Sequence, residues 1–137
     1  MASGRLSVLI VIGKCCMAKA KSTTGMGKEH EEAIVKIFSW DNAHRSKSSG
    51  ASFHDRADVT SNNMVIECEA TENKSYSITL ENWNEVLEKA HSGKHPGWAI
   101  RFRDIEHGKH TDLILMSAHD VSELLEEVET YREMAVK

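Results

Sequence analysis

One eight-residue segment, Met64–Thr71, alternates from Ile66 onward between two kinds of side chain, as a β-strand with one buried face does. The face that begins with Met64 and Ile66 is apolar, whereas the opposite face carries the carboxylates Glu67 and Glu69. A shift of one residue would turn the apolar set toward solvent, so the pattern determines which way each side chain points. We therefore expect a sheet with a core on one face and two acids on the other.

Apolar periodicity elsewhere predicts three helices, over residues 27–41, 79–92 and 119–134. Four further strands are expected at 57–61, 75–79, 98–103 and 111–116. The order α-β-β-β-α-β-β-α predicts an α/β fold with a central mixed five-stranded sheet flanked by helices. The expected core includes the three tryptophans and one stripe of the last helix: Trp40, Trp83, Trp98, Val121, Leu124, Leu125 and Val128.

Length and charge limit what kind of protein this can be. The chain has 137 residues, enough for one ordinary domain, and a net charge of −4. Residues 1–56 hold nine Lys and Arg against five acids, a net of +4, and residues 104–137 hold three bases against nine acids, a net of −6. This asymmetry indicates one side that could face a polyanion such as nucleic acid.

The first 24 residues are expected to be a flexible N-terminal extension to a single domain at 25–137, and Met17 is a plausible true start. An additional strand or a partner-binding arm is the alternative. The apolar run at residues 6–12 is far shorter than a membrane span, so no membrane association is expected. The three cysteines show no zinc spacing, which favours a reducing, intracellular setting without disulfides.

Two adjacent asparagines, Asn62 and Asn63, precede the alternating strand and can form a two-residue hairpin loop, since Asn tolerates positive φ. With Ser61 opposite Met64, Asp58 lies opposite Glu67 on the same face of the sheet. Like charges in this position destabilise a sheet unless something neutralises them, and Mg²⁺ suits two carboxylates. The alternative is an ordinary solvated strand face.

The residues around this hairpin resemble the signature of the PD-(D/E)XK nuclease superfamily. Asp58 is followed, after eight residues, by Ile-Glu-Cys-Glu-Ala-Thr at 66–71, which is similar to the Ile-Glu-Cys-Lys strand of archaeal and phage Holliday junction resolvases. Upstream, Gly27 is followed four residues later by Glu31, as in the first resolvase helix. The resemblance implies a restriction-endonuclease-like core in which Glu31, Asp58 and Glu67 hold the metal.

The chain departs from the family at one place, because the family's Lys is replaced by Glu69. Glu69 could act as a third ligand or as a general base, and Lys74 could supply the missing charge. The resemblance also implies DNA contacts in and near the loop before Asp58. The candidate DNA-binding residues are Arg45, Lys47, Ser48, Ser49 and Lys74.

Together these features predict a metal-dependent, structure-selective endonuclease that cuts branched DNA. The family implies a homodimer acting on four-way junctions, with Mg²⁺ as cofactor and Mn²⁺ as a substitute. It further implies an intracellular protein of a prokaryotic or phage-infected cell. Two alternatives remain: a DNA-binding recombination accessory protein of the same fold with a decayed site, and a nuclease acting on flaps or nicked duplex.

Overall fold

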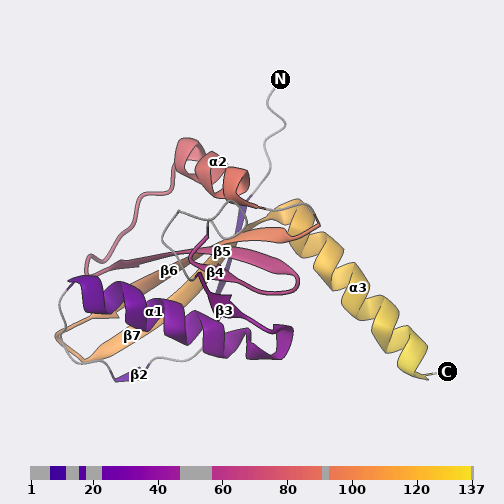
Figure 1. Ribbon diagram of the computed structural model, residues 1–137, viewed down its shortest axis with the longest axis horizontal. Coiled ribbons are helices and arrows are strands. Elements are labelled where there is room, and N and C mark those ends of the chain that lie inside the picture. The colour runs from indigo at the N-terminus through magenta and orange to yellow at the C-terminus, as the bar shows by residue number, and fades with distance from the viewer. Residues whose placement is uncertain (1–6, 12–15, 18–22, 47–56, 91–92, 137) are drawn as a thin grey trace.

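The protein has an α/β fold built on a mixed sheet, as the sequence predicts (Figure 1). A computed structural model describes residues 7–11, 16–17, 23–46, 57–90 and 93–136. The helices are α1 (Thr23–Ile37), a 3₁₀ turn η1 (Ser39–Asp41), α2 (Leu80–Lys89) and α3 (Ala118–Val136). The strands are β1 (Ser7–Val11), β2 (Cys16–Met17), β3 (His44–Arg45), β4 (Val59–Thr60), β5 (Met64–Thr71), β6 (His95–Asp104) and β7 (Lys109–Ser117).

The described strands form one sheet in the order β1-β7-β6-β5-β4-β3, with β2 also paired to β7. Strands β5 and β6 run parallel, joined by the α2 crossover, and the other pairs are antiparallel. Residues 7–11 and 16–17 pair with β7, so these parts of the expected extension belong to the sheet, as the alternative of an additional strand predicts. The short strand β3 was not expected, and it pairs with β4 at the opposite edge.

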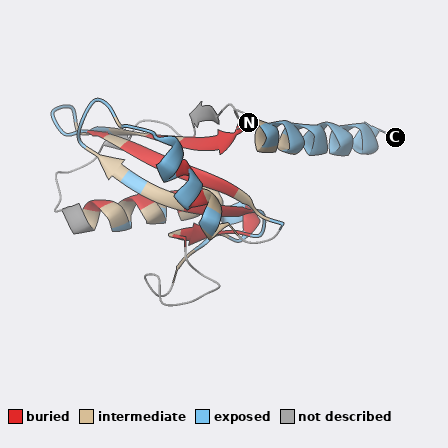
Figure 2. Ribbon diagram, turned by 90° about the horizontal axis from the view of Figure 1, so that it is seen from above, coloured by how far each residue is buried: buried red, intermediate tan, exposed pale blue. Residues whose placement is uncertain are grey.

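Alternation in the strands gives the sheet two separate cores. On one face, Ile34 of α1 packs with Ile66, Ala99 and Ile114. On the other, Trp83 and Val86 of α2 pack with Trp98, Ile100 and Leu115. Thr79 caps α2, its hydroxyl oxygen accepting a hydrogen bond from the backbone N–H of Asn82 at 3.1 Å. Figure 2 shows that the sheet strands carry most of the buried residues, whereas α3 extends away from them and is mainly exposed.

Four expectations about the core and its elements are wrong. Residues 75–79 form no strand; Tyr76 instead packs its ring edge-on against Trp98, with centroids 5.7 Å apart. Trp40 lies in η1 after the helix has ended and is 76% exposed. Leu125 and Val128 are exposed because α3 has already left the sheet at these positions. At Trp40, Leu125 and Val128 an apolar period is present, but no partner element of the described chain covers it.

The β4–β5 hairpin has the expected register, since Val59 pairs with Ile66 and Thr60 with Val65. Its loop, however, is not formed by positive φ at Asn62 or Asn63, and Asn42 is the non-glycine residue of the described chain with that geometry. Asp41 holds the loop instead. Its buried carboxylate accepts hydrogen bonds from the Ser61 hydroxyl at 2.7 Å and from the Asn63 amide nitrogens at 2.9 and 2.6 Å. The 3₁₀ turn η1 thereby positions the hairpin that Asp58 begins.

Polar residues fill the space under the N-terminal half of α1. Arg101 of β6 donates two hydrogen bonds to the carboxylate of Asp112 on β7, at 2.6 and 2.8 Å, and both residues are buried. His30 of α1 is fully buried beside this pair, with its Nε2 3.6 Å from an Asp112 oxygen. Burial lowers the pKa of His30 to about 4, with the Arg101 and His110 charges acting in the same direction and Asp112 opposing them.

This buried histidine should make stability depend on pH. The folded state binds a proton on His30 less readily than the unfolded chain, in which the pKa of this residue is near 6.5. The contribution of neutral His30 to the free energy of unfolding is therefore full above pH 6.5 and is lost as the pH falls toward 4. We expect a loss of about 3 kcal/mol in unfolding free energy across this window. Urea denaturation at pH 7 and pH 4 measures it. His30→Met, which fills similar space and does not titrate, should show a smaller pH slope; an unchanged slope contradicts the assignment.

Candidate active site

Three carboxylates lie on the α2 face of the sheet, where the hairpin register places them. Continuing the observed pairing by one residue sets Asp58 opposite Glu67, and Glu69 follows two residues along the same face. One Asp58 oxygen accepts a hydrogen bond from the backbone N–H of Cys68 at 2.9 Å, which fixes the carboxylate against β5. The hairpin therefore brings together Asp58, Glu67 and Glu69, as the sequence predicts.

A lysine that sequence reasoning missed completes this group. Lys89, in the last turn of α2, donates a hydrogen bond from Nζ to Glu67 Oε1 at 2.8 Å. The available signal was its spacing, because Lys89 follows Trp83 and Val86 at three-residue intervals and so lies on the face of α2 that packs on the sheet. Lys89 thus supplies a positive charge beside the carboxylates.

The charges of the carboxylates raise the pKa values of their neighbours. Burial raises the pKa of Glu67, the Lys89 hydrogen bond opposes this, and the charges of Asp58 and Glu69 raise it further. Burial and Asp58 likewise raise the pKa of Glu69, against Lys89. Burial acts to lower the pKa of Lys89, but its hydrogen bond to Glu67 outweighs this and the pKa is raised. A single lysine therefore faces more negative charge than it can neutralise.

One oxygen of Glu67 is in the position expected for a metal ligand. Glu67 Oε2 is buried and has no hydrogen-bond partner within the described protein, whereas Oε1 is bound by Lys89. A buried carboxylate oxygen without a partner is costly unless a cation or water satisfies it. A cavity of about 160 Å³ adjoins it, lined by Glu67, Glu69, Lys89, Tyr76 and Trp98 among others. These donors fit a hard divalent cation such as Mg²⁺.

Glu31 does not contact this group. Its Oε2 accepts a hydrogen bond from Arg45 Nε at 2.8 Å, and Arg45 also lies 3.9 Å from Glu32. Burial raises the pKa of Cys68, whose backbone N–H binds Asp58, and the charges of Asp58 and Glu31 raise it further. The assignment of Glu31 as a metal ligand thus remains a prediction.

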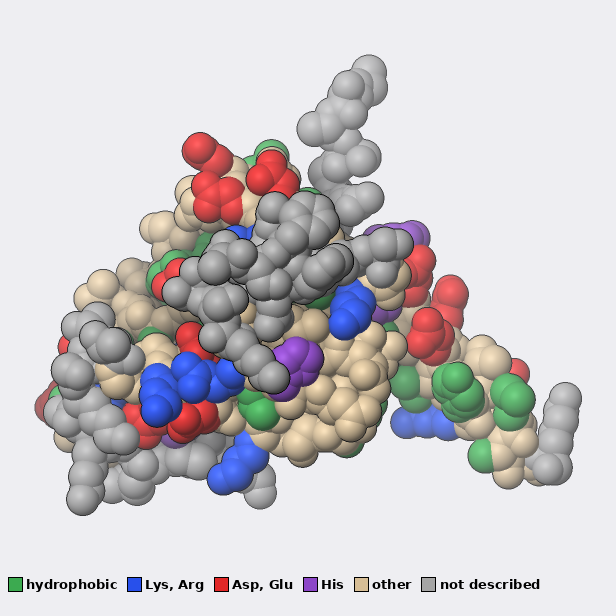
Figure 3. All heavy atoms as spheres, viewed as in Figure 1, with side chains coloured by type: hydrophobic (Ala, Val, Ile, Leu, Met, Phe, Trp, Pro, Cys, Tyr) green, Lys and Arg blue, Asp and Glu red, His purple; other side chains and the backbone are tan. Residues whose placement is uncertain are grey.

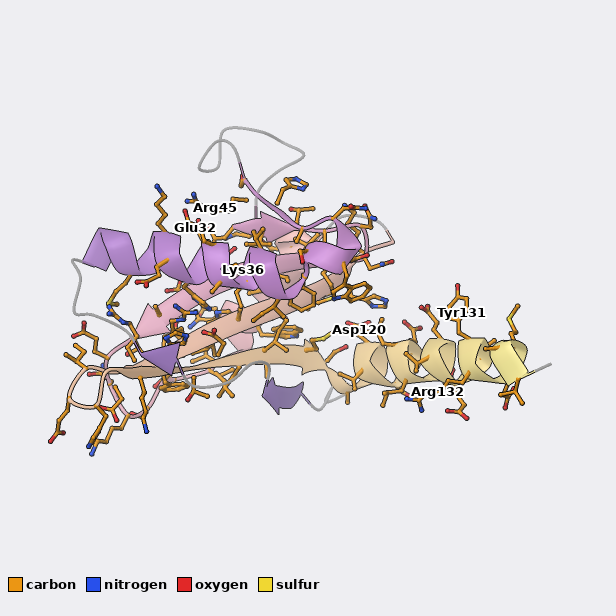
Figure 4. The ribbon with its side chains drawn as sticks, turned by 90° about the horizontal axis from the view of Figure 1, so that it is seen from below. Glu32, Lys36, Arg45, Asp120, Tyr131 and Arg132 are labelled. Atoms are coloured by element: carbon orange, nitrogen blue, oxygen red, sulfur yellow. The ribbon has the colours of Figure 1, made fainter. Side chains whose placement is uncertain are left out.

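The expected DNA-binding residues are distributed over two regions. Arg45 lies beside Glu32 and Lys36 on the outer side of α1, where Lys and Arg side chains gather with acidic ones among them (Figures 3 and 4). Lys74 is exposed in the turn after β5. Lys47, Ser48 and Ser49 lie outside the described residues.

Two other groups bring possible metal ligands close together in the described chain. The ligand atoms of His95, Asp120 and Glu123 lie within 4.8 Å of one another, as do those of the fully exposed set Asp104, Glu106 and His107. Acidic and histidine groups able to hold a metal ion are thus present. The Asp58–Glu67–Glu69 oxygens are not gathered this closely.

No protein-family model, curated protein or solved structure matches this chain. None of the helices in the described ranges is both long and apolar enough to cross a membrane.

Proposed function

We propose that this protein is a metal-dependent endonuclease acting on branched DNA, with four-way junctions as the preferred substrate. The observation that carries the proposal is the convergence of Asp58, Glu67 and Glu69 with Lys89, together with the unpartnered Glu67 Oε2. Carboxylates with one nearby cation are what hydrolysis of a phosphodiester requires. The acids hold a divalent ion, and the lysine offsets phosphate charge.

Each residue of the group has a role in this chemistry. Asp58 and Glu67 would hold Mg²⁺ or Mn²⁺, and Glu31 would join them as the family resemblance implies. The ion, when bound, polarises the phosphate and lowers the pKa of water. Lys89 Nζ donates hydrogen bonds toward the phosphate oxygens, and a Glu69 carboxylate oxygen accepts a proton from the attacking water. The raised pKa of Glu69 brings it nearer the working pH, which suits a general base.

DNA would reach this site along the basic N-terminal part of the chain. The proposed backbone contacts are Lys74 after β5 and the residues that precede Asp58 in the chain, Arg45, Lys47, Ser48 and Ser49. Such contacts read phosphate and shape, in keeping with a substrate that is defined by branching. An intracellular location follows from this substrate.

A junction-cleavage assay tests the proposal. The wild type should cut a labelled four-way junction in Mg²⁺ or Mn²⁺ and not in excess EDTA. Lys89→Met should lower the rate by about 10²-fold or more, since a preorganised cation beside developing charge is worth about 3–4 kcal/mol. Lys94→Met is the matched control, because Lys94 lies before β6 along the α3 groove and should leave the rate unchanged. Equal losses in the two variants would contradict the role of Lys89.

The decayed-site alternative has one observation in its favour, which is that Lys89 already neutralises Glu67 without a metal. A protein of this kind would bind junctions and not cut them. In that case Glu69→Lys should restore cleavage by returning the family arrangement. If the proposal is correct, Glu69→Lys reduces a cleavage that the wild type already shows.

A further inference from the structure

Helix α3 leaves the domain after its first turns and presents an apolar surface to solvent. Leu125, Val128 and Tyr131 are 64%, 44% and 70% exposed. Val121 and Leu124, one turn earlier, pack against the core under the sheet. Figure 4 shows the helix running out from Asp120, beside the sheet, to its far end beyond Tyr131 and Arg132. The same apolar stripe thus starts on the domain and continues where no element of the described chain covers it.

The spacing of this stripe is that of a coiled coil. Val121, Leu124, Val128, Tyr131 and Ala135 follow at intervals of three, four, three and four residues, which are alternating a and d positions of a heptad. A helix that packs only on its own domain needs a broader stripe of period 3.6 and no such continuation. Beyond the residues that pack on the domain, the a positions are Val128 and Ala135 and the d position is Tyr131, and a β-branched residue at a, here Val128, favours two parallel strands.

Charge identifies the partner. Helix α3 has six acids and one base, Arg132, a net of −5, so most partners of its apolar face would be expected to be basic. In the heptad, however, Glu127 is at g and Arg132 at the e position five residues later, which are the two positions that pair between parallel helices. Four of the other acids (Glu123, Glu126, Glu129 and Glu133) fall at b, c and f and point away from the seam. Within its own helix Arg132 reaches only the exposed Glu129, at 3.7 Å.

We propose that α3 pairs with α3 of a second copy of this chain in a parallel two-stranded coiled coil. Val128, Tyr131 and Ala135 form the seam, and Glu127 of each copy pairs with Arg132 of the other. In an antiparallel pair g positions face g positions and e positions face e positions, so Glu127 and Arg132 would not meet. The parallel arrangement sets both domains at the same end of the coiled coil. The proposal does not depend on the chemistry of the acidic site.

Sedimentation of the full chain over a concentration series tests this pairing. The wild type should be a dimer, and Val128→Glu should be a folded monomer with the circular dichroism spectrum of the native domain, because Val128 supports no part of the isolated domain. Glu127→Arg and Arg132→Glu should each weaken the dimer, and the double variant should recover it. A wild type that stays monomeric at every soluble concentration overturns the proposal, and so does a double variant as weak as the single ones.

Cross-linking distinguishes the parallel from any other arrangement. Ala135→Cys at an a position places two thiols across the seam, so mild oxidation should give a covalent dimer. Glu133→Cys at an outer f position is the control and should not cross-link above the background of the native cysteines. Equal cross-linking of both variants, or none with Ala135→Cys, contradicts a parallel seam. Neither result bears on cleavage by the acidic site, so the two proposals fail separately.

Discussion

Asp58→Asn and Glu67→Gln are each expected to reduce junction cleavage by about 10²-fold or more, because several kcal/mol of transition-state stabilisation depend on the bound ion. Both changes keep the shape of the side chain. In Asp58→Asn the new amide oxygen can still accept the hydrogen bond from the Cys68 N–H, so the hairpin should remain folded. Junction binding should be retained or tightened, since a negative charge near phosphate has been removed.

The control for these variants is Glu85→Gln. Glu85 lines the same cavity from α2, but its side chain is exposed and it is not one of the proposed ligands. Rates of cleavage and junction binding should be measured for all three variants at one salt concentration. If Asp58→Asn and Glu67→Gln both cut like Glu85→Gln, the metal site is not at this hairpin.

Asp112→Ala should be the most destabilising single change in the core, at about 3–5 kcal/mol. Arg101 would then keep its charge in a buried position without its carboxylate partner. Urea denaturation monitored by circular dichroism gives the change in unfolding free energy. Replacing both partners, as Arg101→Met with Asp112→Leu, should recover most of the loss, because two apolar side chains need no pairing.

Asp104→Asn serves as the comparison on the neighbouring strand. Asp104 pairs with His107 at 2.7 Å, but both side chains are exposed. Surface pairs contribute little, so this change should leave the free energy of unfolding nearly unchanged. If Asp112→Ala costs no more than Asp104→Asn, the Arg101–Asp112 pair is not a main contributor to the stability of the core.

The hairpin could be predicted from sequence because its determinants are local. The alternation of β5 from Ile66 onward determines which side chains share a face of the sheet. The short hairpin loop determines the register, so Asp58, Glu67 and Glu69 lie on the same side. The α/β class follows for a similar reason, since strands and helices alternate along the chain with periods of 2 and 3.6.

What could not be predicted depends on contacts between distant elements. Lys89 reaches Glu67 only because α2 crosses the face of β5, and no local pattern encodes that approach. Asp41 holds the hairpin loop in a way that no turn rule anticipates. Trp40 and Val128 fall on apolar periods, yet periodicity indicates a surface that needs a partner and does not say whether the chain itself provides one.

The pairing of β1 with β7 has a consequence for synthesis. Leu9 lies opposite Leu115, so the paired residues are separated by 106 positions in the chain. Contacts of such separation cost the most loop-closure entropy and form late in folding. During translation β1 leaves the ribosome long before its partner exists, and β7 itself must first pair with β6. We expect the apolar segment Ser7–Val11 to stay unpaired until nearly the whole chain has been made, and to be the part of the nascent protein most in need of a chaperone.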